Sequence, residues 1–300
     1  MRIAGTVLFA AYLEPLNSHL KNGGSMSGTL YLVPTPIGNL GDISRRCAET
    51  LAAADFIAAE DTRVSLKLLN HLELKKPLVS YHEHNKKESG PRILERLLAG
   101  ERCALVTDAG CPAISDPGED LVRLCAQAGV TVCALPGPCA AITALSVSAL
   151  ATGRFAFEGF LPAQKKERKT RLERLKSEER TMIFYEAPHR LRDTLAELLA
   201  AFGPDRPVSL CRELTKLHEE ILRLTLGGAA EYYAENEPRG EYVLVVAGAE
   251  QTIEAVSLEQ AAELVRELTQ TGVRTKDAVK QVAEETGVAK NALYAAVVAE

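Results

Sequence analysis

Short apolar segments alternate with longer amphipathic ones from residue 29 onward, through the first half of the chain. The apolar segments are rich in Val, Ile, Leu and Ala and are too short for buried helices, so they predict buried strands. The strands are expected at residues 29–33, 55–60, 77–81, 103–107 and 130–135. Repeated βα units of this length predict a parallel sheet that is covered by helices on both faces.

Polar residues indicate where two of the intervening helices begin. Asp42 is a residue type that caps helix N-termini, so a helix is expected to start at Ile43. Asp116 precedes Pro117, and Glu119 stands where it can complete a capping box. A second helix is therefore expected to start at this Asp-Pro pair.

The pattern changes after about residue 152. An irregular aromatic segment is followed by a highly charged helix, a strand, and a helix that begins at Pro188 and ends at Gly203. Two further strands enclose hairpin-like material. The charged helix and the three strands are expected at residues 164–180, 181–186, 207–214 and 241–248. This mixture predicts a second α/β domain with a more antiparallel, mixed sheet.

The chain of 300 residues is long enough for about two domains, and a helical tail follows them. The tail has a turn at Thr286-Gly287, and its apolar spacing resembles a helix-turn-helix. Its acidic and basic residues nearly balance, so a docking helical hairpin is as well supported as DNA binding. The expected divisions are a disordered leader or mis-start at 1–26, α/β domains at 27–152 and 153–250, and a helical domain at 251–300.

Composition and charge narrow the possible functions. The net charge is -5, which excludes a uniformly basic nucleic-acid sleeve and leaves only a local basic patch for phosphate contact. Trp is absent and aromatic residues make up 5% of the chain, which argues against an aromatic stacking platform. No apolar run approaches the roughly 20 residues that span a membrane. Of the function classes considered, these exclusions leave a soluble enzyme or a soluble binding protein.

The seven cysteines are odd in number and form no Cys-x-x-Cys motif. This usage is typical of a reducing compartment rather than of a disulfide or zinc framework, and it predicts a cytoplasmic protein. His82 and His84 are close enough in sequence to share a metal ion, but no third ligand accompanies them. No metal is therefore expected.

Three loops at strand ends carry the most informative residues. They span residues 34–39, 108–118 and 136–140 and consist mainly of Pro, Gly and small side chains. In open α/β sheets, ligands bind at the carboxyl ends of the strands, and such loops let a ligand approach the backbone closely. Neither a dinucleotide fingerprint nor a phosphate P-loop is present. The loops suit a largely neutral ligand, such as a nucleoside with an amino-acid tail.

Eight motifs in this order carry a resemblance to a known family: PTPIGNLGDIS, AAEDTR, DAGCPAISDPG, LPGPCA, FEGFLP, YEAPHR, RELTKLHEE and RGEYVLVV. The chain resembles the tetrapyrrole methylase superfamily and, within it, the subgroup of ribosomal RNA small subunit methyltransferase I. The resemblance implies an S-adenosylmethionine-dependent 2′-O-methyltransferase that acts on a cytidine in the decoding region of 16S rRNA. It also implies a homodimer that holds the methyl donor in a cleft between two α/β domains, and rRNA or the small ribosomal subunit as partner.

The resemblance also assigns contacts to the methyl donor. They are Pro36, Ile37, Gly38, Asp108, Cys111, Ile114, Ser115, Cys139, Ala140, Tyr185, Leu214 and Glu241. The subgroup usually has Thr at the position of Cys111 and Ser at that of Cys139. A thiol forms weaker hydrogen bonds than a hydroxyl, so the backbone is expected to make the main contacts there.

A base that accepts the proton of the ribose hydroxyl could come from one of two motifs. Glu60 and Asp61 end the second strand and face the same crevice, although Asp61 could instead cap the next helix. Lys216 is the other candidate, and it could equally clamp an RNA phosphate.

A concentrated basic segment at 164–176 is the expected RNA-binding surface. The alternative is an ordinary solvated helix with ion pairs between neighbouring turns. The expected RNA contacts are Arg63, Lys165, Lys166, Arg168, Lys169, Arg171 and Arg212.

Two other functions remain open. One is methylation of a tetrapyrrole or a diphthine intermediate by a sister enzyme. The other is a non-enzymatic, ligand-sensing nucleic-acid regulator that uses the helical tail as its output.

Overall fold

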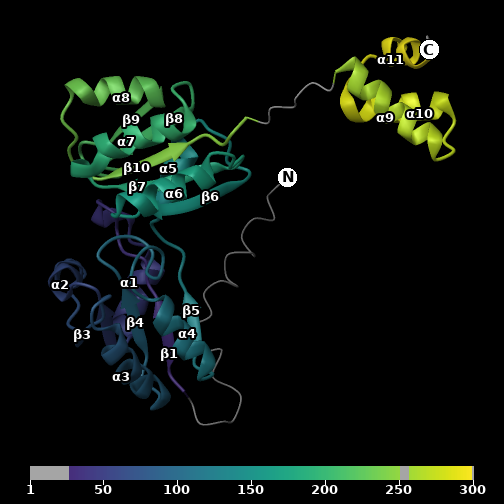
Figure 1. The fold of residues 1–300 in the computed structure, drawn as a ribbon. Helices are drawn as coiled ribbons and strands as arrows, with labels where there is room; N and C mark the ends of the chain where they lie inside the picture. The colour runs from purple at the N-terminus through teal and green to yellow at the C-terminus, as the bar shows by residue number, and fades with distance from the viewer. Residues whose placement is uncertain (1–26, 251–256, 299–300) are drawn as a thin grey trace, which may run out of the picture. The chain divides into compact units, whose positions relative to one another are not determined.

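The computed structural model of the protein describes residues 27–250 and 257–298. The chain divides after Gly248 into two compact units, the larger of which contains two β-sheets (Figure 1). The predicted leader at 1–26 lies outside the described residues. Among the described residues, no helix is long and apolar enough to cross a membrane.

The first sheet is entirely parallel, as predicted, with the strand order β3-β2-β4-β1-β5. Its strands are β1 (Thr29–Leu32), β2 (Phe56–Ala59), β3 (Leu78–Ser80), β4 (Cys103–Val106) and β5 (Thr131–Ala134). The helices that follow them are α1 (Arg45–Ala53), α2 (Thr62–His71), α3 (Lys86–Leu98), α4 (Glu119–Gln127) and α5 (Ala140–Val147).

Two hydrophobic clusters cover the two faces of this sheet. Phe56 and Ala58 of β2 belong to the cluster formed with α3 and α4, whereas Ile57 and Ala59 belong to the cluster formed with α1 and α2. Successive side chains of a strand point to opposite faces, so a strand that is covered on both sides needs apolar residues at every position. This explains why β2 is an uninterrupted apolar run.

The second sheet is mixed and has the order β6-β7-β10-β8-β9. Only β6 and β7 pair in parallel, and the other neighbours are antiparallel. Its strands are β6 (Phe155–Phe160), β7 (Thr181–Glu186), β8 (Pro207–Arg212), β9 (Glu220–Thr225) and β10 (Tyr242–Val246). Its helices are α6 (Lys165–Leu175), α7 (Pro188–Phe202) and α8 (Leu226–Glu235), which cover one face.

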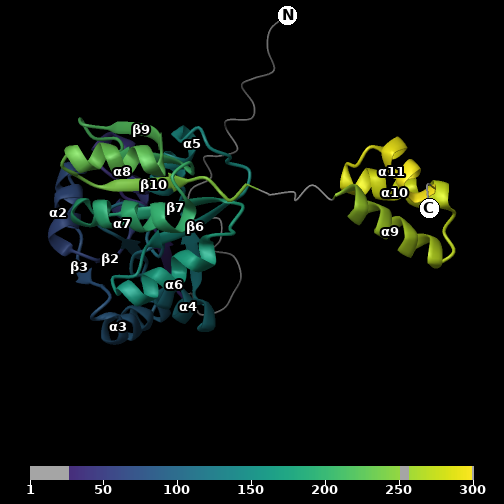
Figure 2. The ribbon, with the colours of Figure 1, turned by 45° about the horizontal axis from the view of Figure 1, so that its top comes forward.

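Helix α5 joins the two sheets. It follows the last strand of the first sheet, but its buried face packs against the second sheet (Figures 1 and 2). Ala141 and Ala144 of α5 lie in one cluster with Ile183, Val243 and Val245. The two predicted α/β domains therefore share a core that rests on small residues of one helix.

Two helix starts were predicted wrongly. Residues Leu40–Asp42 form a single 3-10 turn, and α1 begins later, after Ser44, whose hydroxyl accepts a hydrogen bond from the Cys47 N–H. Helix α4 begins after Gly118 without a side-chain cap. Gly118 has a φ of 149°, which favours glycine, and the chain reaches the helix through this residue.

Two predictions for the second sheet also need correction. The strand expected at 207–214 ends at Arg212, and the residues after it form a loop in which Glu213 and Thr215 have positive φ angles. The material expected to be hairpin-like consists of β9, which does pair with β8 as a hairpin, followed by helix α8.

Residues 257–298 of the C-terminal unit form three helices, α9 (Leu258–Gln270), α10 (Thr275–Thr286) and α11 (Lys290–Val298). They enclose a small core of Ala and Val with Leu293. Gly287 ends α10 in the left-handed conformation, which glycine adopts without strain. The turn thus falls where the sequence predicts it.

Candidate active site

The three Pro- and Gly-rich loops meet at the carboxyl ends of β1, β4 and β5. Thr35 and Gly110 exchange two backbone hydrogen bonds, with N···O distances of 2.9 and 3.0 Å. The Cys111 thiol donates to the carbonyl oxygen of Pro138 at 3.3 Å. Gly137 packs so closely that a Cβ atom there would lie 2.6 Å from Cβ of Pro34. The contacts make one rigid surface from three separate segments.

A cavity of about 500 Å³ lies between this surface and the second sheet. Its volume falls in the range of small-molecule sites, roughly 300–1,000 Å³. Ten of the twelve residues predicted to contact the methyl donor line it, namely Ile37, Asp108, Cys111, Ile114, Ser115, Cys139, Ala140, Tyr185, Leu214 and Glu241. Pro36 and Gly38 do not.

Gly38 has a packing role instead. A Cβ atom on Gly38 would overlap with Cγ of Lys216 and lie 3.0 Å from the Thr215 hydroxyl oxygen. Glycine at this position therefore lets the first loop approach the loop after β8. This close approach brings Leu214 and Lys216 to the cavity.

The two cysteines that replace the usual hydroxyl residues both line the cavity. Cys139 precedes the first residue of α5, as its N-cap. Hydrogen bonding with Cys111, supported by the backbone N–H groups of Ile142 and Ala141, lowers the pKa of the Cys139 thiol although burial opposes this.

Tyr185 and Phe160 form part of the opposite wall, and Phe157 packs behind them. The Tyr185 hydroxyl accepts a hydrogen bond from the Ala141 N–H at 3.2 Å, which ties β7 to the start of α5. Burial raises the pKa of Tyr185 to about 12, so the phenol stays neutral. The rings of Phe157 and Phe160 meet the Tyr185 ring edge to face, with centroids 5.1 and 5.6 Å away.

Lys216 lines the cavity between two carboxylates. Its Nζ atom lies 2.9 Å from Oε1 of Glu213 and 2.8 Å from Oε2 of Glu241. Burial by itself lowers the pKa of Lys216, but the hydrogen bonds to Glu241 and Glu213 outweigh it, and the net shift is upward. A lysine held in its charged form cannot accept a proton at neutral pH. The surroundings favour Lys216 as a fixed cation.

The two predicted acidic candidates have different surroundings. Asp61 is not among the residues that line the cavity. Its carboxylate caps α2 by accepting from the Arg63 N–H at 2.8 Å, and it pairs with the Arg63 guanidinium at 2.6 Å. These contacts lower the pKa of Asp61 to about 2, which makes it a poor base. Glu60 lines the cavity and accepts a hydrogen bond from the Thr107 hydroxyl at 2.7 Å.

Asp116 also lines the cavity, and the sequence analysis assigned it only to a helix start. Burial and the charges of Glu60 and Asp108 raise the pKa of Asp116 to about 6, although a hydrogen bond with Thr107 partly opposes them. The preceding residues Ala113 and Ser115 have φ angles of 69° and 63°, a strained conformation for residues with side chains. Both the strain and the position in a cavity-forming loop are signals of a functional residue.

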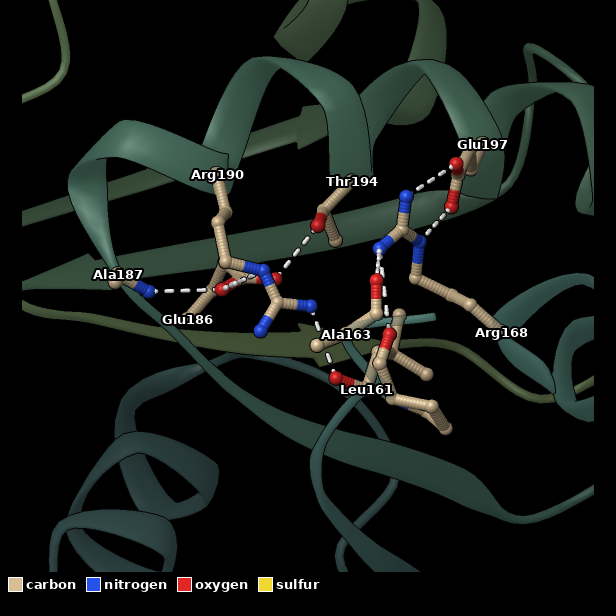
Figure 3. A network of polar contacts seen from close by, with 9 residues as sticks. Leu161, Ala163, Arg168, Glu186, Ala187, Arg190, Thr194 and Glu197 are labelled. Carbon is tan, nitrogen blue, oxygen red and sulfur yellow. Dashed lines mark hydrogen bonds and ion pairs between the residues drawn. The ribbon is translucent and has the colours of Figure 1, made fainter. Parts of the chain in front are cut away.

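Glu186 is a further lining residue that the sequence analysis did not identify. It is almost fully buried and accepts hydrogen bonds from the Thr194 hydroxyl at 2.6 Å and the Ala187 N–H at 2.9 Å (Figure 3). Arg190 pairs with it at 3.5 Å and also donates to the Leu161 carbonyl at 2.9 Å. Glu186 thus anchors the start of α7 and, through Arg190, the segment after β6.

Four of the arginines predicted to bind RNA are held in ion pairs. Arg63 pairs with Asp61, Arg168 with Glu197, Arg171 with Glu158 and Arg212 with Glu220. Arg168 also donates to the carbonyls of Pro162 and Ala163, so it stabilises the segment after β6 (Figure 3). By contrast, no carboxylate of the described residues forms an ion pair with the exposed side chains of Lys165, Lys166 and Lys169.

Within the described ranges, no group of three or more His, Cys, Asp and Glu side chains could hold a metal ion.

The sheets, the helical unit and the loop-lined cavity define the class of a two-domain α/β protein with a small-molecule site and a helical tail. A family model of the tetrapyrrole (corrin/porphyrin) methylases matches residues 29–230, and one of the RsmI C-terminal HTH domain matches residues 254–300. The chain belongs to the tetrapyrrole methylase family and, within it, to the group of ribosomal RNA small subunit methyltransferase I.

Curated relatives support this membership over nearly the whole chain. The ribosomal RNA small subunit methyltransferase I of Halalkalibacterium halodurans is 49% identical over 271 residues, which cover 89% of this chain and 93% of the relative. The protein of the same name from Synechocystis is 48% identical over 268 residues, which cover 89% and 96%. The one from Escherichia coli O157:H7 is 46% identical over 279 residues, which cover 91% and 96%.

Solved structures confirm the fold of the two-sheet unit. Uroporphyrin-III C-methyltransferase from Thermus thermophilus, complexed with S-adenyl homocysteine, has a TM-score of 0.53 at 21% identity and covers 73% of this chain and 97% of that one. A diphthine synthase has a TM-score of 0.56 at 14% identity and covers 73% and 90%. The predicted fold class is therefore confirmed.

Proposed function

We propose that this protein transfers a methyl group from S-adenosylmethionine to the ribose 2′-oxygen of a cytidine in the decoding region of 16S rRNA. Relatives that are almost half identical over about nine-tenths of the chain bear the name of small subunit rRNA methyltransferases. This similarity is the observation that carries the proposal, because it includes the loops and the helical tail. It favours rRNA over the tetrapyrrole or diphthine substrates of more distant relatives.

The cavity suits the proposed donor. Its first-sheet side is formed by three loops whose Gly and Pro residues expose backbone groups, and its other side is aromatic and apolar at Tyr185 and Leu214. Such a site can hold an adenosine by backbone hydrogen bonds and apolar contact. Ile37, Asp108 and Ala140 would hold it from the first sheet. Bound there, S-adenosylmethionine supplies a methyl group on a positively charged sulfur.

The chemistry requires positioning more than charge. The positive charge at sulfur disappears in the transition state, so a carboxylate beside the sulfur would stabilise the ground state more. Backbone carbonyls of the rigid loops are better neighbours. Loops that are fixed to each other by the Thr35–Gly110 hydrogen bonds can keep the reacting oxygen, carbon and sulfur in line.

The hydroxyl proton of the ribose must be removed, and Asp116 is the residue that we assign to this step. A carboxylate with a pKa of about 6 is mostly ionised at pH 7 and is still more basic than an ordinary aspartate. Glu60 lies in the same part of the cavity and, through the Thr107 hydroxyl, has a positioning role.

The remaining parts of the proposal concern the partners. The exposed lysines of α6 would contact rRNA phosphates, since the paired arginines are already occupied. The family resemblance supports a homodimer, and the seven unpaired cysteines support a cytoplasmic location.

The test is transfer of a labelled methyl group from S-adenosylmethionine to purified 30S subunits. The proposal expects label on one cytidine ribose of 16S rRNA, and no label when that nucleotide carries a 2′-deoxyribose in a reconstituted subunit. Label on a base, or donor binding in calorimetry without any labelled RNA, would contradict it.

A further inference from the structure

The end of β6 contains an irregularity beside the cavity. In the pairing with β7, Phe157 lies opposite Ile183, but Gly159 and not Glu158 lies opposite Phe184. One extra residue is thus inserted into β6 as a β-bulge. Gly159 has a φ of 62°, the left-handed conformation that glycine adopts freely. Bulges commonly turn a side chain toward an active site.

The bulge determines which way Phe160 points. Side chains alternate along a regular strand, so Phe160, three residues after Phe157, would lie on the opposite face. With the inserted residue, Phe160 lies opposite Tyr185 while Phe157 lies opposite Ile183. Phe157 and Phe160 therefore share the face that borders the cavity, and both contact the Tyr185 ring.

Of these three aromatic residues, only Phe160 is largely uncovered. Its exposed fraction is 54%, whereas Phe157 and Tyr185 pack partly buried against the cluster beneath α5. Tyr185 holds the ring of Phe160 from one side, and its own hydroxyl is bound to Ala141. The free side of a large aromatic ring is thus presented at the wall of a cavity.

The backbone on either side of this ring is held in place. Leu161, the next residue, accepts a hydrogen bond from Arg190 at 2.9 Å, and Arg168 binds the two carbonyls after it (Figure 3). Arg171 neutralises Glu158, the other residue at the bulge, at 2.5 Å. Helix α6 with its exposed lysines begins at Lys165 and lies beside β6 (Figure 2). The backbone on both sides of Phe160 is therefore fixed, which holds its ring in one position.

The scarcity of aromatic residues argues against an extended stacking surface, but one ring is enough for one base. We propose that the ring of Phe160 is a stacking platform for the nucleobase of the nucleotide that is methylated. The inference rests on the proposed function and specifies how its substrate is held. A nucleotide whose ribose enters this cavity leaves its neighbours in the RNA, and an aromatic side chain can replace the stacking that its base loses. A ring with one free side at the wall of a cavity and a rigid backbone has the features of such a platform.

The chain offers a matched pair of variants. Phe160→Leu removes the aromatic face and keeps an apolar side chain of similar reach, while Phe160→Trp keeps an aromatic face. Phe155→Leu is the control, because Phe155 is 38% exposed on the same strand but does not line the cavity. Thermal unfolding of each variant verifies that it is folded, as expected for a side chain that is more than half exposed.

Two constants are measured for each variant, the KM for 30S subunits and the Kd for S-adenosylmethionine by calorimetry. Loss of one base–aromatic stack predicts a KM that is at least about five-fold higher in Phe160→Leu. Phe160→Trp should stay within about two-fold of the wild type, and so should the control. The donor Kd should be unchanged in all three.

The opposite outcomes separate the alternatives. A weaker donor Kd with an unchanged KM for subunits would place the donor's adenine, not the substrate base, on Phe160. Unchanged constants in an active enzyme would refute the stacking platform alone. A wild-type protein that labels no rRNA would refute the proposed function and the platform together.

Discussion

The carboxylates near the cavity differ because their neighbours differ. Asp61 is stabilised as an anion by Arg63 and the start of α2, so its affinity for a proton is low. Asp116 has no such cation, and Glu60 and Asp108 add negative charge around it. The same side chain therefore has a pKa of about 2 in one place and about 6 in the other. This contrast is what distinguishes a helix cap from a candidate base.

Asp116→Asn should reduce kcat on 30S subunits by roughly 100-fold, the lower end of what general base catalysis contributes. In the wild type, the rate should rise with pH through about 6 and then level off, because Asp116 must be ionised. The asparagine variant should lack this inflection. Asp120→Asn serves as the control for kcat, because Asp120 pairs with Lys86 and Arg123 and does not line the cavity, so its pH–rate profile should match the wild type. Retention of the inflection in Asp116→Asn would contradict the role.

The same substitution, which should lower activity, should raise the stability of the folded protein at high pH. The fold raises the pKa of Asp116 from 3.8 to about 6. The contribution of this residue to the free energy of unfolding is therefore complete only below about pH 4, and it is lost as the pH rises through 6. Asp116→Asn should therefore stabilise the protein relative to wild type at pH 8 but not at pH 4. Because Asp116 is half-buried, the expected gain in the free energy of unfolding at pH 8 is about 1–2 kcal/mol, or a few degrees in Tm. Equal Tm differences at both pH values would contradict the raised pKa.

Among the elements, α6 combines two kinds of basic residue. Arg168 and Arg171 pair with Glu197 and Glu158 and stabilise the second domain. The lysines of the same helix are exposed. Charge in the sequence alone therefore does not separate an RNA contact from a structural ion pair, because the partners lie 13 and 29 residues away along the chain.

Reversal of Lys165, Lys166 and Lys169 to Glu should raise the KM for 30S subunits at least about ten-fold at moderate salt. The slope of log KM against log salt should become shallower, since fewer counterions are released. Donor affinity and Tm should stay near the wild type. Reversal of Lys67, Lys75 and Lys87 to Glu, three exposed lysines of the first domain, is the charge-matched control. If the control raises KM as much as the α6 variant, the change in KM comes from the net charge of the protein, and α6 is not an RNA-binding helix.

The strands and the cavity-forming loops were predictable because their signals are local. An apolar run such as Phe56–Ala59 predicts a strand buried on both faces, and Pro and Gly mark the loops without any knowledge of tertiary contacts. The helix start at Asp42 was wrong because Ser44, a second capping residue two positions later, caps α1. The start at Asp116 was wrong because this residue lines the cavity. Phe160 could not be predicted, since its orientation depends on one inserted residue in the pairing of β6 with β7.

At the scale of the whole molecule, the contact between α5 and the second sheet, called the α5 joint below, positions one wall of the cavity. Ala144 is fully buried between α5 and the second sheet, and the Cys211 thiol of β8 points at its carbonyl. Small residues at this contact let α5 lie close to β7 and β10. The positions of Cys139 and Ala140 at the cavity wall follow from that approach.

Ala144→Leu should overpack this joint and destabilise the protein by about 1–3 kcal/mol, which lowers Tm by several degrees. Donor affinity should fall as well, because the two walls of the cavity separate. Ala126→Leu, on an exposed position of α4, adds the same side chain without a buried contact. An Ala144→Leu variant with unchanged Tm and donor Kd would show that the contact between α5 and the second sheet accommodates a larger side chain.

The placement of α5 also governs how this fold can be recombined. A chimera that exchanges the second half of the chain at residue 152 would keep α5 from one parent and the sheet beneath it from another, and would thus mismatch Ala141 and Ala144 with Val243 and Val245. A crossover before residue 140 keeps the helix with the sheet on which it lies. The second halves of related chains are therefore exchangeable only together with this helix.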